Sequence, residues 1–87
     1  MKILCLKDVI RKDIPIYYRR LYTGVAVMEM NNSPVEYRID FSIEHKPTGE
    51  KLINVTFIEQ IDYPLIPIMK EIKTYIDDLD FNGGLPD

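Results

Sequence analysis

The sequence predicts one α+β domain: an antiparallel three- to four-stranded β-meander sheet, packed on one face by a single C-terminal amphipathic α-helix. Two patterns support this prediction: strict alternation of apolar and polar residues in the middle of the chain, and helical spacing of apolar residues after residue 61. A chain of 87 residues has the size of one domain with a thin core. We expect residues 1–81 to form this domain and residues 82–87 to form a flexible tail.

Residues 1–13 are compatible with more than one structure. Cys5, the only cysteine of the chain, excludes an intrachain disulfide and is expected to be a small buried hydrophobic residue. The other apolar residues suit a short strand followed by a helical turn, or one short helix. They are also candidates for a lid over an open face of the sheet: Ile3, Leu4, Leu6, Val9 and Ile10.

Residues 17–30 are rich in strand-forming residues and are followed by the turn-forming Asn31-Asn32-Ser33-Pro34. Gly24 predicts a bulge or bend in one long strand, or a break between two short strands. Both faces of this segment are apolar. The alternation leaves open which set faces the core: Val25 and Val27, or Ala26, Met28 and Met30.

Apolar and polar residues alternate without interruption from Val35 to His45, which predicts a strand with one buried face. The next four residues, Lys46-Pro47-Thr48-Gly49, suit a type I turn followed by a G1 bulge, because Pro47 presets φ and Gly49 accepts the left-handed conformation. This turn imposes a register in which apolar residues face one another: Ile43 with Ile53, Phe41 with Val55, and Ile39 with Phe57.

Beyond Ile61 the apolar residues repeat at spacings of three and four, which is typical of an amphipathic helix. Pro64 and Pro67 place its start within residues 64–67, since proline is tolerated only in the first turn. Asn82-Gly83-Gly84 ends it, with Gly83 as a left-handed cap. The apolar stripe comprises Leu65, Ile68, Met69, Ile72, Tyr75, Ile76 and Leu79.

The chain carries no catalytic motif, so we expect no enzyme activity, no cofactor and no metal. A Cys–His nucleophile pair would have to combine Cys5 with His45, the single histidine, and these lie in different predicted elements. Acidic residues near the helix end, together with Asp62 and Asp87, admit a Mg²⁺ or Ca²⁺ site, but a solvated helix end is the simpler interpretation: Asp77, Asp78 and Asp80. Because these acids oppose the helix dipole, we expect a cation, or an arginine of this chain or of a partner, to offset them.

The segment Tyr17–Tyr22 is the strongest candidate for a recognition surface, because it interleaves tyrosine with Arg19 and Arg20. Such a pattern suits single-stranded nucleic acid and equally suits a protein interface. A third interpretation is a strand at the edge of the core whose arginines pair with acidic residues. The candidate binding residues, including one from the next strand, are Tyr17, Tyr18, Arg19, Arg20, Tyr22 and Arg38.

A net charge of −3 argues against a general nucleic-acid binder. We therefore expect a small non-enzymatic binding or regulatory module that acts through protein–protein contacts, as a homodimer or with another protein. A homodimer is expected because one helix covers one face of a sheet that is apolar on both. The alternative is a nucleic-acid-binding accessory protein that uses the Tyr/Arg strand. The two are distinguished by whether the arginines and lysines form one basic patch or pair with acids.

No stretch resembles an export signal or the ~20 apolar residues of a membrane span. The expected location is therefore the cytoplasm, with no membrane partner.

Overall fold

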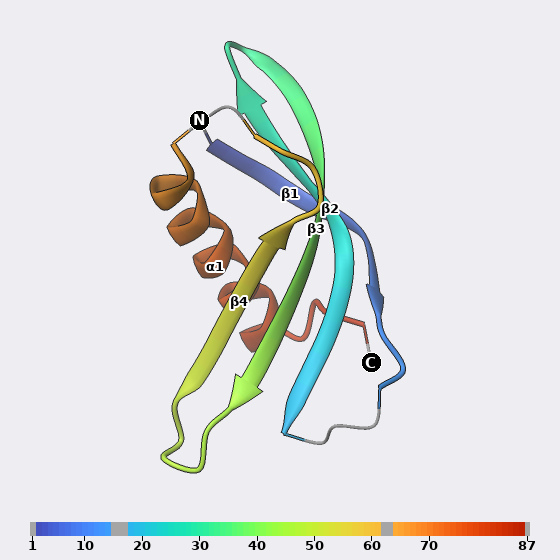
Figure 1. Cartoon of the computed structure of the whole chain (residues 1–87), viewed down its shortest axis with the longest axis vertical. Coiled ribbons are helices and arrows are strands. Elements are labelled where there is room, and N and C mark those ends of the chain that lie inside the picture. Colours follow the sequence, from blue (N-terminus) through green and yellow to red (C-terminus); the bar gives the residue numbers. More distant parts are fainter. Residues whose placement is uncertain (1, 15–17, 62–63, 87) are drawn as a thin grey trace.

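The computed structural model describes residues 2–14, 18–61 and 64–86. Within them, one helix follows four strands: β1 (Lys2–Arg11), β2 (Arg19–Met30), β3 (Ser33–His45), β4 (Lys51–Phe57) and α1 (Leu65–Phe81). The strands form one antiparallel sheet in the order β1-β2-β3-β4, so each strand pairs with its neighbours in the chain (Figure 1). The predicted fold class is confirmed, with four strands.

The hairpin of β3 and β4 has the predicted turn and register. Gly49 has a φ of 90°, and its N–H donates to the Lys46 carbonyl over 2.9 Å. The Lys46 N–H in turn donates to the Glu50 carbonyl over 2.9 Å, which closes the hairpin. All three expected cross-strand pairs are present: Ile43 with Ile53, Phe41 with Val55, and Ile39 with Phe57.

β2 and β3 are joined at Asn31 and Asn32, which both have positive φ (51° and 64°), as a two-residue type I′ turn requires. β2 runs past Gly24 without a break or a shift against β3, so the predicted irregularity within β2 is wrong. The shift lies in β1, between Lys7 and Ile10. A Cβ on Gly24 would lie 3.2 Å from Val9 Cγ2, so the glycine permits the close approach of this bulged segment.

The N-terminal segment extends the sheet instead of covering it. β1 pairs antiparallel with β2 along one edge. Ile3 is buried, and Leu6 and Val9 pack against the core. The helical alternative and the expected lid are therefore both wrong for these residues. A strand in this place satisfies the backbone of both β1 and β2 while it buries one apolar side, which a helix laid on the opposite face would not do.

The core lies between α1 and one face of the sheet, here called the inner face (Figure 1). On β2, Ala26 and Met28 point inward, and Val25 and Val27 lie half-buried on the opposite, outer face. α1 contacts the two edge strands, β4 and β1. The buried residues are Ile3, Tyr22, Ala26, Met28, Ile39, Phe41, Ile43, Val55, Ile68, Ile72 and Ile76.

α1 begins at Leu65, inside the predicted window, and ends at Phe81. Gly83 has a φ of 72°, and its N–H donates to the Asp80 carbonyl over 3.2 Å. The Gly84 N–H donates to the Leu79 carbonyl over 2.8 Å, which completes a Schellman motif. The described part of the chain contains no helix long and apolar enough to span a membrane.

Candidate functional site

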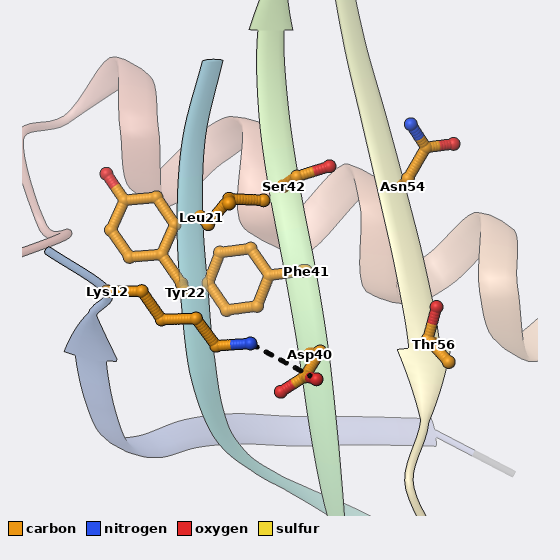
Figure 2. Close-up of a pocket in the computed structure, with 8 residues that line it drawn as sticks. All are labelled: Lys12, Leu21, Tyr22, Asp40, Phe41, Ser42, Asn54 and Thr56. Atoms are coloured by element: carbon orange, nitrogen blue, oxygen red, sulfur yellow. Dashed lines mark ion pairs between the residues drawn. The ribbon is translucent and has the colours of Figure 1, made fainter. Parts of the chain in front are cut away.

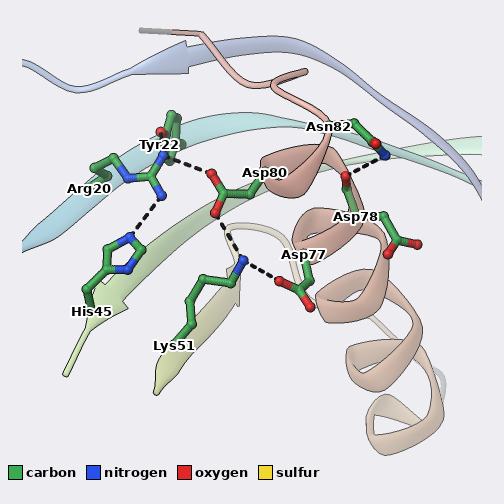
Figure 3. A network of polar contacts seen from close by, with 8 residues as sticks. All are labelled: Arg20, Tyr22, His45, Lys51, Asp77, Asp78, Asp80 and Asn82. Carbon is green, nitrogen blue, oxygen red and sulfur yellow. Dashed lines mark hydrogen bonds and ion pairs between the residues drawn. The ribbon is translucent and has the colours of Figure 1, made fainter. Parts of the chain in front are cut away.

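A polar network joins the C-terminal end of α1 to the sheet (Figure 3). Arg20 Nη1 lies 2.9 Å from Asp80 Oδ1, and Lys51 Nζ donates to Asp80 Oδ2 over 3.0 Å. Lys51 also pairs with Asp77. On the sheet side, Arg20 lies 3.2 Å from the Tyr22 hydroxyl and 3.1 Å from His45 Nε2.

Two basic side chains of the sheet thus offset the acidic helix end, as the dipole argument required. The hydrogen bond from Arg20 is the main reason that the pKa of Asp80 lies below its ordinary value, and Lys51 acts in the same direction. Hydrogen bonds from Lys51 to Asp77 and then Asp80 raise the pKa of Lys51. The network therefore holds its charged forms and fastens the helix to β2 and β4.

This network also accounts for the carboxylate cluster. Among the described residues no group of His, Cys, Asp or Glu is arranged to hold a metal ion. Asp62 and Asp87, which sequence reasoning considered with this cluster, lie outside the described residues. Sequence reasoning missed Lys51 as a partner. Its signal was the period of β4, which places Lys51 on the same face as Ile53 and Val55.

The Tyr/Arg segment is divided among several surroundings. Tyr22 is fully buried and stacks on Phe41, with ring centroids 5.0 Å apart, so it is a core side chain. Arg20 lies on the same inner face, in the network described above. Tyr18 is half-exposed and lines a hollow at the sheet end with Glu44, His45, Lys46 and Pro47. Tyr17 lies outside the described residues.

Arg19 and Arg38 occupy the outer face, at separate positions. Arg19 lies opposite Glu44 and forms an ion pair with it over 3.7 Å. Arg38 lies opposite Val25, further along the sheet, and its Nε pairs with Glu59 over 3.3 Å. The fold therefore does not bring the candidate binding residues together on one surface.

Sequence reasoning also missed a shallow polar hollow of about 190 Å³ on the outer face (Figure 2). Lys12 Nζ and Asp40 Oδ2 form an ion pair there over 3.3 Å. The hollow is further lined by Leu21, Tyr22, Phe41, Ser42, Asn54 and Thr56. Register arithmetic could have found the polar members, because Ser42 lies opposite Asn54 and Asp40 opposite Thr56.

The chemistry of the hollow is hydrogen bonding by hydroxyl, amide and paired charged groups. Neither Cys5 nor His45 lies in it. Cys5 pairs with Val27 near one end of the sheet, whereas His45 ends β3 beside Lys51 at the other, so the fold does not form the nucleophile pair considered from sequence.

Neither the curated proteins nor the solved structures compared with this chain contain a match. A family model matches residues 1–81, which include all four strands and the helix. The chain therefore belongs to the BB_0187 family.

Proposed function

We propose that this chain is a small non-enzymatic module that acts through protein–protein contacts, as a homo-oligomer located in the cytoplasm. The observation that carries the proposal is the pairing of its basic residues with acids on scattered parts of the sheet. These pairs are Lys12 with Asp40, Arg19 with Glu44, Arg20 with Asp80, and Arg38 with Glu59.

This pairing disfavours the nucleic-acid alternative. Binding of nucleic acid depends on cations that neutralise phosphates, and a carboxylate beside each cation competes for that role. Base stacking also needs exposed aromatic faces, whereas Tyr22 is buried against Phe41. The Tyr/Arg pattern is therefore better explained by folding than by recognition of bases.

Self-association is supported by the mixed character of the outer face. Charges of both signs alternate there with half-buried Val25 and Val27, a composition that resembles protein interfaces. Leu52 and Ile58, which are 38% and 50% exposed, extend the apolar surface along β4 and just beyond it. A surface that carries both signs of charge is suited to a second copy of itself.

Size-exclusion chromatography with light scattering tests this proposal against the monomer mass of 10.2 kDa. We expect a mass above that of the monomer at tens of micromolar protein. Fluorescence anisotropy with labelled single-stranded RNA and duplex DNA at low salt provides the second measurement, and we expect no salt-dependent binding. A monomer at every concentration, together with nucleic-acid binding that weakens with salt, would favour the alternative.

A further inference from the structure

β4 is an edge strand with an open row of backbone groups. Among the described residues, β3 lies on one side of β4 and no strand lies on the other. The Ile58 N–H donates to the Arg38 carbonyl and the Lys46 N–H donates to the Glu50 carbonyl. Because hydrogen-bonded pairs alternate along antiparallel strands, the groups directed away from β3 belong to Lys51, Ile53, Val55 and Phe57.

The two edges of the sheet differ in their protection. β1 has two register shifts, Asp8 has a φ of 53°, and the Ile3 N–H is capped by Glu71 Oε1 over 2.9 Å. Such bulges and caps block the addition of another strand. β4 pairs with β3 in a continuous register and contains neither proline nor glycine. Its one charged residue, Lys51, is directed toward Asp77 and Asp80 of the helix.

Two hollows lie along this unprotected edge, between β4 and α1. One, of about 430 Å³, is mainly apolar and is lined by residues that include Val55, Phe57, Leu65 and Met69. The other, of about 340 Å³, lies toward the turn and is lined by Lys51, Leu52, Ile53, Lys73, Thr74 and Asp77. Alternate side chains of an added strand point to the same face of the sheet, so both hollows are placed to receive them.

We infer that the partner at this edge is β4 of a second copy, paired antiparallel about a two-fold axis that passes beside Asn54. This inference rests on the proposed function and assigns its surface. Asn54 is the central residue of Lys51–Phe57, so only this axis overlaps the two strands over their full length. It also brings outward-directed backbone groups opposite one another, as Ile53 then faces Val55 of the second copy.

The side chains match in this register. On the inner face Ile53 lies opposite Val55 of the second copy, and on the outer face Leu52 lies opposite Thr56. No uncompensated like charges meet, because the Lys51 ammonium is already paired within its own chain. The exposed apolar residues near β4 gain cover in the dimer: Leu52, Ile58 and Leu65.

Disulfide trapping tests the register directly. Asn54 and its copy form a non-hydrogen-bonded pair, in which the Cα atoms lie about 4.5 Å apart, close enough for a disulfide. We expect Asn54→Cys, in a Cys5→Ser background, to form a covalent dimer under mild oxidation. Thr48→Cys in the same background is the matched control on the exposed turn of the same hairpin, and we expect it to stay monomeric on a non-reducing gel.

Charge reversal provides the second measurement. Asn54→Lys places two ammonium groups opposite each other and is expected to raise the dimer dissociation constant by about tenfold or more, and Asn54→Asp acts in the same way. Mixing the two variants should restore a dimer, which a merely unfolded variant would not do. Thr48→Lys is the control with the same change in charge.

Three results would overturn the inference. If the protein forms dimers that Asn54→Lys leaves unchanged and that Asn54→Cys does not trap, the β4 edge is excluded while self-association stands. If the wild type is a monomer that binds an extended peptide in competition with a β4 peptide, the edge binds another protein. A monomer without such binding contradicts both the edge pairing and the homo-oligomer.

Discussion

The Arg20 guanidinium of β2 lies 2.9 Å from the Asp80 carboxylate in the last turn of α1, and the two side chains are only 23% and 15% exposed. This ion pair, reinforced by Lys51, is the polar link between the helix end and the sheet. Because it is shielded from water on most sides, it contributes more than a pair on the open surface.

Asp80→Asn should therefore destabilise the fold. We expect a loss of about 1–3 kcal/mol at neutral pH, because Arg20 and Lys51 both lose a charged partner in a partly buried place. Asp78→Asn is the matched control, since Asp78 is exposed and accepts a hydrogen bond from Asn82 through its backbone carbonyl. Urea unfolding followed by circular dichroism measures both. Equal losses in the two variants would show that the ion pair adds no stability.

The contribution of Asp80 should depend on pH in the acid range. The folded protein holds the pKa of Asp80 below its ordinary value, so the unfolded chain takes up a proton first as the pH falls. The stabilisation is then complete above about pH 4, near the ordinary pKa of aspartate, and is lost as the pH falls through the lower folded value. We expect the stability difference between wild type and Asp80→Asn to shrink over this interval. A difference that stayed constant from neutral pH to strong acid would contradict the assignment.

Phe41→Ala tests the register of the central hairpin. Phe41 is 3% exposed, stacks on Tyr22 and lies opposite Val55, so its loss should cost about 3–5 kcal/mol. Phe81→Ala removes the same ring from a side chain that is 89% exposed and should change the unfolding free energy by less than about 0.5 kcal/mol. Thermal unfolding of the two variants gives the comparison. A shift of only a degree or two for Phe41→Ala would place this residue outside the core.

Gly49→Ala tests the turn that sets this register. The φ of 90° is strained for any residue with a Cβ, although no atom lies within 4 Å of the place where that Cβ would be. The expected loss is therefore a backbone effect of about 1–2 kcal/mol. Gly49→Asn should lose less, because asparagine tolerates positive φ. If alanine and asparagine were equally tolerated, the left-handed conformation would not be what the glycine provides.

Local patterns determined much of this fold. Alternation from Val35 to His45 and the Pro47–Gly49 turn specify each other's register, because both act over neighbouring residues and a shift of one residue would expose the whole apolar face. The helix was equally readable, since its apolar stripe and its proline and glycine boundaries are all local signals. The same reasoning showed that something must offset the acids at the helix end, but not that Lys51 would.

Tertiary structure alone decided which of two apolar faces of β2 became the core, where residues 2–11 lie, and which acid each arginine meets. On β2, Ala26 and Val25 are both acceptable inside, and the choice falls to Ala26 because the inner face of β3 and the helix lie on that side. β1 became an edge strand because it satisfies the hydrogen bonds of β2. Arg20 meets Asp80 because the helix crosses the inner face, a long-range arrangement that no local pattern in either segment encodes.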